Sequence, residues 1–416
     1  MEPATAVDEP HDVRMRGFAR RTTVAAAWEW IDGHARRIES ERIPLERAGG
    51  RVLATDVTSS VDVPGFDRSM MDGYALLADQ TQGASHYNRM ELQIVGESLP
   101  GRPFGGTVGR GQSVRIMTGA PVPAGADAVL PAERVDASGS LLCVLDEVPR
   151  GKNIGLRGED IVAGTRVLAA GRVLRPQDLG VLASIGTVNV EVSRQPRVRI
   201  VITGNELLPA GSAPQPSKII DANGPMLAAL VARDGGVAIN PGIVPDEPAA
   251  ILAAMREDAD IVLVSGGSSV GQEDYAPSLL AKHGELAIHG VAMRPSSPAG
   301  MGRLGDKLVF LLPGNPVSCL CAYDFFAGRA LRLLGGRKKA WPYPVRQISL
   351  SRKLVSTVGR LDYARVKIVE GRVEPISISG ASILSSTTRA DGFVIVPADS
   401  EGYPEGTMVD VFLYDS

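Results

Sequence analysis

Acidic side chains in the second half of the chain have a spacing that could gather them around a divalent cation. Glu206 and Asp274 each follow an apolar, strand-like run, and Asp221 and Asp246 each precede a segment with helical spacing. Carboxylate oxygens suit Mg²⁺, which often bridges to substrate phosphates. A plainer interpretation stays open for Asp221 and Asp246, because each of them alone is more typical of a helix N-cap.

Apolar runs in the same region end in glycine-containing loops that could approach an anion closely. VRIVIT (198–203) leads into Gly-Asn-Glu, DIVLVS (260–265) into GGSSVGQEDY (266–275), and KLVFLL (307–312) into PGNP (313–316). Glycine permits close backbone approach, and the positive end of a following helix favours phosphate. The Walker-A and GxGxxG spacings of nucleotide sites are both missing. GGSSVG alone is therefore more typical of a plain turn.

The elements that must position these loops alternate between strand and helix from Arg197 onward. The spacing predicts helices around 224–233, 247–257, 275–282 and 317–334, with apolar strands between them. Such alternation is typical of a parallel sheet covered on both faces. Ligands of open parallel sheets bind beyond the carboxyl ends of the strands, so we expect the loops to share one edge.

The sequence patterns in the rest of the chain predict a multi-domain fold that combines an α/β domain with β domains. Short β-like runs separated by Gly and Pro lie on both sides of the α/β region, and Thr22 or Thr23 and Pro176 stand at predicted helix starts. We expect a flexible arm (1–21), a linker and dimerisation region (22–60 with 150–196), an inserted β domain (61–149), the α/β domain (197–336) and a C-terminal β-barrel (341–416).

Composition excludes several classes of protein. The 416 residues include 44 Lys and Arg against 47 Asp and Glu, a net charge of −3, whereas nucleic-acid binders usually carry a basic excess. The acidic N-terminus is not a secretory signal, and no apolar run approaches the ~18 residues of a membrane span. Cys143, Cys319 and Cys321 are too few for a disulfide framework. We expect a reduced, soluble, cytoplasmic protein.

Several motifs occur together and in one order. They are PGFDRSMMDGYAL (64–76), RIMTGAPVP (115–123), KNIGLRGEDI (152–161), TGNEL (203–207), SGGSSVGQEDY (265–275), LPGNPVSC (312–319), GRLDYARVKI (359–368) and GASILSS (380–386). With them the chain resembles the MoeA family of molybdopterin molybdenumtransferases, which includes the gephyrin-type E domain. The resemblance spans about residues 20–416.

The resemblance implies a fold, an activity and partners. The expected fold is an elongated homodimer in which the α/β region is a molybdopterin-binding domain of the MogA/MoaB type. The expected reaction inserts molybdate into adenylylated molybdopterin, with Mg²⁺ assisting the release of AMP. Further partners implied are a molybdopterin adenylyltransferase and recipient molybdoenzymes.

The resemblance also assigns roles to matching positions. Glu206, Asp246 and Asp274 are the expected catalytic residues, and Glu206 and Asp274 the expected Mg²⁺ ligands. The expected substrate-binding residues are Asp72, Thr118, Asp160, Asp221, Gly266, Gly267, Ser268, Arg294, Pro313, Gly314, Asn315, Pro316, Arg365 and Ser382, with Arg360 as a neighbour of Arg365. Without the family match, Asp72 and Thr118 would be interpreted as turn caps.

The chain departs from the family pattern after the GEDY loop. Gly290 and Ser297 stand where lysine is common, Arg294 replaces another lysine, and Asn205 replaces a common Asp. Arginine does not reproduce the point charge of lysine. The lost lysines favour an alternative, a non-catalytic carrier of molybdopterin or finished cofactor. A further alternative is an adenylyltransferase or nucleotide hydrolase, although such proteins can work with the α/β domain alone.

Overall fold

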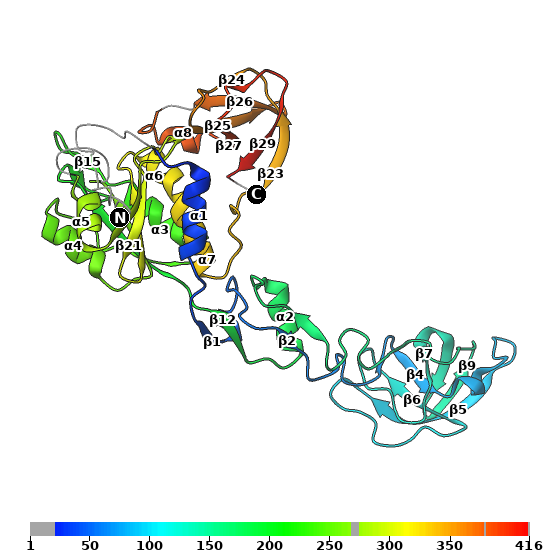
Figure 1. The fold of residues 1–416 in the computed structure, drawn as a ribbon. Helices are drawn as coiled ribbons and strands as arrows, with labels where there is room; N and C mark the ends of the chain where they lie inside the picture. The colour runs from blue at the N-terminus through cyan, green and yellow to red at the C-terminus, as the bar shows by residue number, and fades with distance from the viewer. Residues whose placement is uncertain (1–20, 268–273, 378–379, 415–416) are drawn as a thin grey trace, which may run out of the picture. The chain divides into compact units, whose positions relative to one another are not determined.

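The structure is a computed structural model that describes residues 21–267, 274–377 and 380–414 (Figure 1). These residues form two compact units. The first unit is drawn from 21–42, 50–54 and 191–414, and the second from 43–49 and 55–190. The chain crosses from one unit to the other within β1 (Ser40–Pro44), after Gly49, after Ala54 and within β12 (Asn189–Ser193). The predicted arm, apart from Arg21, lies outside the described residues, and the predicted domain boundaries stay predictions.

A seven-stranded sheet forms the centre of the α/β domain, in the order β16-β13-β18-β22-β21-β19 with β17 beside β13. Apolar, β-branched runs such as IVLVS build its buried strands. The strands are β13 (Arg197–Thr203), β16 (Val237–Ile239), β17 (Ile243–Val244), β18 (Ile261–Ser265), β19 (Glu285–His289), β21 (Gly300–Leu304) and β22 (Lys307–Leu312).

The sheet is mixed, so the expectation of a parallel sheet is only partly right. β13, β16, β17, β18 and β22 run parallel, whereas β21 is antiparallel to both of its neighbours. Only Gly305 and Asp306 separate β21 from β22. A parallel crossover needs a dozen or more residues, so this short connection forces an antiparallel pair.

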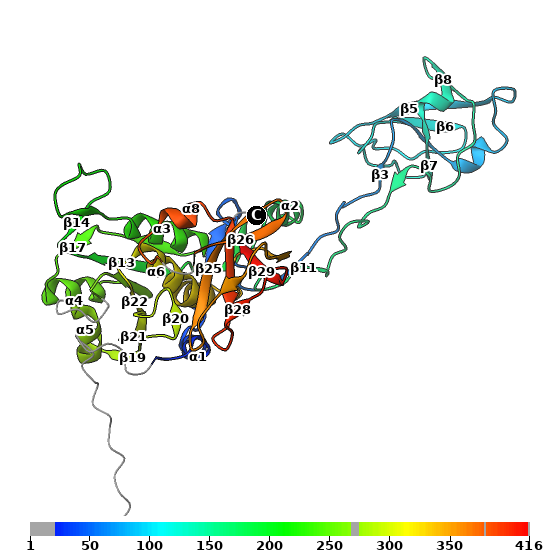
Figure 2. The same cartoon turned by 90° about the horizontal axis from the view of Figure 1, so that it is seen from above.

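Helices cover both faces of the sheet, as the sequence predicts (Figures 1 and 2). Successive residues of β13 point to opposite faces of the sheet. Ile200 packs in the cluster with α1, α3, α6 and α7, and Val201 packs in the cluster with α4 and α5. The helices are α1 (Val24–His34), α3 (Asn223–Arg233), α4 (Pro248–Arg256), α5 (Tyr275–His283), α6 (Pro316–Ala322), a π-helical turn (Tyr323–Ala327) and α7 (Gly328–Leu334). Among the described residues, none of the helices has the length and apolar character needed to cross a membrane.

The C-terminal domain is a six-stranded sheet in the order β20-β25-β27-β29-β23, with β26 beside β25. An isolated bridge between Leu350 and Val373 links the end of β23 to β26. Closure of these strands into a complete barrel stays a prediction. The elements are β20 (Met293–Arg294), β23 (Val345–Ser349), β24 (Leu354–Val355), β25 (Leu361–Val369), β26 (Arg372–Ser377), α8 (Ser385–Thr388), β27 (Gly392–Val396), β28 (Gly402–Tyr403) and β29 (Met408–Leu413).

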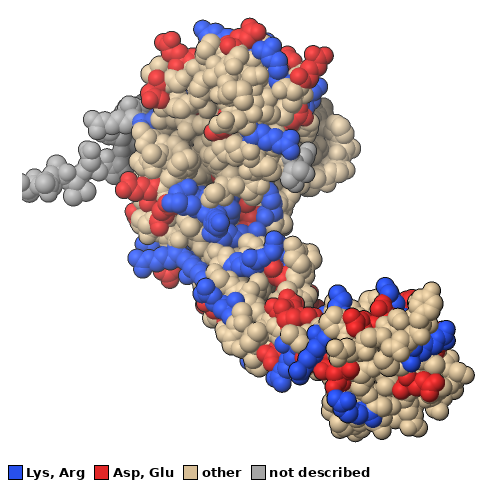
Figure 3. Space-filling model, turned by 90° about the vertical axis from the view of Figure 1, so that its right-hand side faces the viewer, with Lys and Arg blue, Asp and Glu red and all other residues tan. Residues whose placement is uncertain are grey.

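The second unit contains the predicted β-rich segment and the helix α2 (Pro176–Ser184), which begins at Pro176 as the sequence predicts. Its main sheet has the order β7-β4-β6-β5-β9-β8. On the face drawn in Figure 3, acidic and basic side chains are interspersed over this β domain. The strands are β2 (Val57–Thr58), β3 (Arg68–Ser69), β4 (Gly73–Leu76), β5 (Met90–Ser98), β6 (Gln112–Ile116), β7 (Ala128–Pro131), β8 (Val135–Ser138), β9 (Leu141–Val144), β10 (Ile154–Gly155) and β11 (Arg166–Leu168).

Candidate functional site

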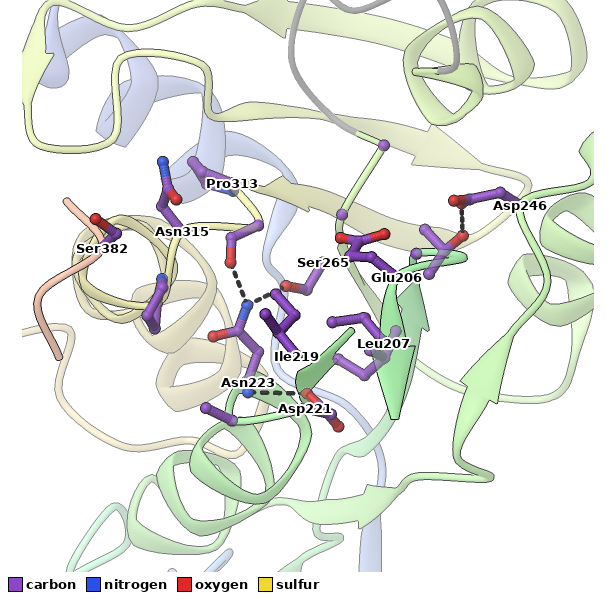
Figure 4. A pocket seen from close by; sticks show the side chains of 18 of the residues that line it. Glu206, Leu207, Ile219, Asp221, Asn223, Asp246, Ser265, Pro313, Asn315 and Ser382 are labelled. Atoms are coloured by element: carbon purple, nitrogen blue, oxygen red, sulfur yellow. Dashed lines mark hydrogen bonds between the residues drawn. The ribbon is translucent and has the colours of Figure 1, made fainter. Parts of the chain in front are cut away.

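A cavity of about 620 Å³ lies at the carboxyl ends of β13, β18 and β22, inside the first unit (Figure 4). This is the edge at which ligands of α/β sheets bind. Most of the predicted site residues line it: Glu206, Asp221, Asp246, Gly266, Gly267, Asp274, Pro313, Gly314, Asn315, Pro316 and Ser382. Ser268 lies outside the described residues.

Glu206 and Asp274 line the same cavity although they lie 68 positions apart in the sequence. Glu206 belongs to the turn after β13, and Asp274 precedes α5. In Figure 4, Glu206 and Asp246 lie toward one end of the pocket, and Asn315 and Ser382 toward the other. The arrangement places two carboxylates at the edge of the sheet where a cation could be held.

Asp246 supports the turn that carries Glu206. Its carboxylate accepts a hydrogen bond from the hydroxyl of Thr203 and another, at 2.9 Å, from the backbone N–H of Asn205. The helix-cap interpretation is wrong for this residue, because α4 has Glu247 at its N-cap and no side-chain cap. Asp246 therefore orients the loop after β13 from a neighbouring loop.

Asp221 is the cap that its sequence context indicates. Its Oδ1 accepts hydrogen bonds from the backbone N–H groups of Asn223 and Gly224, both at 2.9 Å. A Cβ at Gly224 would lie 2.4 Å from Asp221 Oδ2, so a larger residue there would displace this carboxylate. Asp221 thus fixes the start of α3 at the cavity wall.

Asn223 joins the loops of the site, and the sequence analysis missed it. Its Nδ2 donates to Ser265 Oγ at 2.9 Å and to the carbonyl of Gly314 at 2.8 Å. The side chain is almost fully buried and lines the cavity. One amide therefore ties α3 to the ends of β18 and β22. One feature of the sequence could have indicated this role: Asn223 is a polar residue at the start of a predicted helix, on a face that is otherwise apolar.

The donor set of the cavity fits Mg²⁺ bound together with a substrate. In the described part of its lining, the ionisable side chains are the carboxylates of Glu206, Asp221, Asp246 and Asp274, with no Lys or Arg. The described residues contain no group of three or more His, Cys, Asp or Glu that could hold a metal ion by themselves. Mg²⁺ commonly keeps one or two carboxylates and takes its other ligands from water and substrate phosphates.

Arg294 and Arg365 do not line the cavity, although both are expected substrate-binding residues. Arg294 makes a bidentate ion pair with the buried Asp362, with Nε 2.9 Å from Oδ1. Arg365 is fully buried, and its Nη1 donates to the carbonyl of Gly380 at 3.5 Å. The sequence could not indicate these partners, because only the folded chain brings Arg294 beside Asp362, through the pairing of β20 with β25, and Arg365 beside Gly380. Arg360, on the turn before β25, is also outside the lining.

Asp72, Thr118 and Asp160 belong to the second unit. Asp72 Oδ1 accepts hydrogen bonds from the backbone N–H of Thr118 at 2.7 Å and from its hydroxyl at 2.8 Å. These bonds hold the pKa of Asp72 below its usual value. The contacts match the turn-cap interpretation, and Asp160 is exposed. A substrate role for the three stays a prediction.

The segment that departs from the family pattern has local structural roles. Gly290 has a φ of 91°, a left-handed conformation that a lysine would adopt only with strain. The hydroxyl of Ser297 accepts a hydrogen bond from Arg21 Nε at 2.8 Å. Gly290 thus permits the local backbone conformation, and Ser297 takes part in a side-chain hydrogen bond.

Comparisons with known proteins agree with this architecture. Residues 22–186 match the family described as "MoeA N-terminal region (domain I and II)", residues 199–332 match "Probable molybdopterin binding domain", and residues 347–414 match "MoeA C-terminal region (domain IV)". Together these matches run along nearly the whole described chain.

Similar proteins share this full length. Molybdopterin molybdenumtransferase 2 of Mycobacterium tuberculosis is 34% identical over 89% of this chain and 94% of its own. The molybdopterin molybdenumtransferase of Staphylococcus aureus is 31% identical over 90% and 91%. The crystal structure of the molybdopterin biosynthesis MoeA protein from Pyrococcus horikoshii superposes with a TM-score of 0.79 at 32% identity, covering 95% of this chain and 100% of that one. The chain therefore belongs to the MoeA family of molybdopterin molybdenumtransferases.

Proposed function

We propose that the chain inserts molybdate into adenylylated molybdopterin in the cavity of the α/β domain, with Mg²⁺ assisting the release of AMP. Membership of the family makes the chain an enzyme of molybdenum cofactor biosynthesis, a transferase. The observation that carries the proposal of mechanism is the shared cavity of Glu206 and Asp274 at the carboxyl edge of the sheet. The carrier alternative finds no support in the named relatives.

Glu206 and Asp274 hold Mg²⁺ in this proposal, and the bound cation would neutralise charge on the phosphoanhydride that is cleaved. Asp246 keeps the Glu206 turn in place through Asn205. Asn223 and Asp221 fix the opposite loops, so the substrate meets a preformed site. The glycines at 266, 267 and 314 contribute backbone, without side chains, to the lining of the cavity.

Metal and substrate bind together in this arrangement. An anionic substrate entering a cavity lined by carboxylates meets like charge unless cations accompany it. A cation held by two carboxylates has ligand positions left for phosphate oxygens. The same cation thus attracts the substrate and is itself retained by it.

The remaining expectations complete the proposal. The protein acts as a cytoplasmic homodimer, receives its substrate from a molybdopterin adenylyltransferase and passes cofactor to molybdoenzymes. Ser382 helps to position molybdate or pterin, and Asp72, Thr118, Asp160, Arg294 and Arg365 contribute to substrate binding. Sedimentation of a species near 43.8 kDa at micromolar concentration would contradict the homodimer.

The test is AMP release from adenylylated molybdopterin, with and without molybdate, in the presence of Mg²⁺. We expect molybdate-dependent release by the unaltered chain and its loss in Asp274→Ala and Glu206→Ala. Asp306→Ala is the matched control, because Asp306 is an exposed carboxylate of the same domain at the turn before β22. Release that does not depend on molybdate, or that survives Asp274→Ala, would overturn the proposal.

A further inference from the structure

Two aliphatic side chains form an apolar wall beside the carboxylate end of the cavity, whose lining also includes Ile202, Ile220 and three prolines (Pro298, Pro313 and Pro316). β14 (Leu207–Leu208) pairs in parallel with β15 (Ile219–Ile220), and Leu207 stands opposite Ile219. Cross-strand partners share one face of a ladder, so their side chains lie together. Both line the cavity, and Ile219 is 58% exposed. Figure 4 shows the two side chains next to one another, between Asn223 and Glu206.

This wall is fixed to the turn that carries the proposed metal ligand. The backbone N–H of Ile219 donates to the carbonyl of Glu206 at 2.9 Å, and the ammonium group of Lys218 donates to the carbonyl of Asn205. At the other end of the ladder, the N–H of Asp221 donates to the carbonyl of Leu208 at 2.8 Å. The apolar pair therefore keeps a constant position relative to Glu206 and to the capped start of α3.

Elsewhere the lining consists partly of bare backbone. A Cβ at Gly266 would lie 2.0 Å from the carbonyl oxygen of Thr203, and a Cβ at Gly314 would lie 3.7 Å from Gly266 Cα. The two glycine backbones thus come close to each other, and a side chain at Gly266 is excluded. Peptide planes and aliphatic groups are surfaces on which a flat ring can lie, with polar groups meeting its edges.

We propose that Leu207 and Ile219 receive the flat nitrogen heteroaromatic ring of the substrate, while its phosphates reach the carboxylate end of the cavity. This inference rests on the proposed function and deepens it by locating a ring within the site. A single exposed isoleucine is unremarkable on a protein surface. A cross-strand pair that faces a ligand cavity beside Glu206 offers an apolar contact that phosphate or molybdate cannot use. The proposed substrate has two such rings, a purine and a pterin.

The test is a comparison of three probes by calorimetry in the presence of Mg²⁺. AMP carries the purine and a phosphate, pterin-6-carboxylate carries the pterin, and ribose 5-phosphate carries a phosphate without a ring. The variant is Ile219→Asn, which keeps the number of side-chain heavy atoms and removes the apolar character. Val237→Asn is the matched control, because Val237 is an exposed aliphatic residue on β16 of the same domain and lies outside the cavity lining. Circular dichroism checks the fold of both variants.

We expect Ile219→Asn to weaken the binding of AMP or of pterin-6-carboxylate by about tenfold, because most of one aliphatic contact with the ring is lost. Ribose 5-phosphate should bind the variant and the unaltered chain equally, and Val237→Asn should bind all probes as the unaltered chain does. The probe that weakens identifies which ring the pair receives.

Two results would overturn this inference alone, provided that the unaltered chain releases AMP with molybdate. One is that Ile219→Asn binds both ring probes as tightly as the unaltered chain does. The other is that the variant loses as much affinity for ribose 5-phosphate as for the ring probes. An unaltered chain that binds none of the probes and releases no AMP would overturn the proposed function as well.

Discussion

The carboxylate of Asp246 and the backbone N–H of Asn205 form a hydrogen bond of 2.9 Å between two loops of the same sheet edge. Asn205 immediately precedes Glu206, so this bond sets the direction in which the Glu206 side chain leaves the turn. The second bond of Asp246, from the Thr203 hydroxyl, holds the end of β13 in the same way. A residue that resembles a helix cap in the sequence is therefore a positioning residue of the site.

Removal of these bonds should impair the reaction more than the fold. We expect Asp246→Ala to lower molybdate-dependent AMP release by about 10- to 100-fold, as supporting residues of metal sites do. Asp246→Asn, which retains one acceptor oxygen, should give a smaller loss. The measurement is the rate as a function of Mg²⁺ concentration, with Glu247→Ala as control because its exposed side chain makes no cap. Equal rates for Asp246→Ala and the control would refute the positioning role.

Binding of nucleotide should depend on the metal. Since the described cavity lining presents carboxylates and no Lys or Arg, we expect AMP to bind at least about tenfold more weakly when Mg²⁺ is removed with EDTA. Adenosine is the control ligand, because without a phosphate its binding should not respond to Mg²⁺. Calorimetry checks both, and AMP binding that is indifferent to EDTA would speak against joint binding of metal and substrate.

Arg294 offers a prediction that separates stability from catalysis. Asp362 is 1% exposed at its side chain, so Arg294→Ala leaves a buried carboxylate without its guanidinium. We expect a loss of about 2–4 kcal/mol in the free energy of unfolding, partly restored by Asp362→Asn in the same chain. Urea denaturation gives the values, with the exposed Arg346→Ala as control.

A kinetic effect of Arg294→Ala without an effect on stability would support the substrate-binding role that the family resemblance implies. If KM for adenylylated molybdopterin rises several-fold while the free energy of unfolding is unchanged, the ion pair is not its main role. The two readouts therefore distinguish the contact seen in the structure from the one implied by the family resemblance.

Asp178 makes the stability of the second unit depend on pH. Arg172 holds its carboxylate with bonds of 2.8 and 2.9 Å, and the backbone N–H of Arg175 adds a third at 2.9 Å. The bonds from Arg172, followed by those from Arg175, hold the pKa of this buried carboxyl well below its usual range. A lowered pKa in the folded chain stabilises it above the ordinary Asp value of about 3.9, and the gain fades as the pH falls below that value.

We therefore expect Asp178→Asn to destabilise the chain by about 1–3 kcal/mol at pH 7 and by progressively less in acid. Scanning calorimetry from pH 7 to pH 3 measures the difference between the variant and the unaltered chain. The exposed Asp136→Asn serves as control. A difference that stays constant or grows toward pH 3 would show that the assigned pKa direction is wrong.

The sequence predicts the features that local patterns determine. The consecutive apolar residues 200–202 of β13 indicate a strand buried on both faces, and Ile200 and Val201 indeed pack in different clusters. The same patterns place the loops after β13, β18 and β22 at one edge, where Glu206 and Asp274 share a cavity. Asp221 also behaves as the cap that its neighbours indicate.

Features that depend on distant partners could not be predicted. GMGRL has too many glycines to be recognised as β21, and its direction follows from the short turn at Gly305. Asn223 bonds Ser265 and Gly314, residues that only the folded sheet brings near it. Arg294 finds Asp362 through the pairing of β20 with β25. In each case the contact partner lies outside the local sequence window.

Single-turnover AMP release at saturating adenylylated molybdopterin, with and without molybdate, tests the proposed Mg²⁺ site of Glu206 and Asp274 most directly. The unaltered chain should release AMP only when molybdate and Mg²⁺ are both present, and the Glu206→Ala/Asp274→Ala double variant should release none above background. Undiminished release by that double variant would contradict the account.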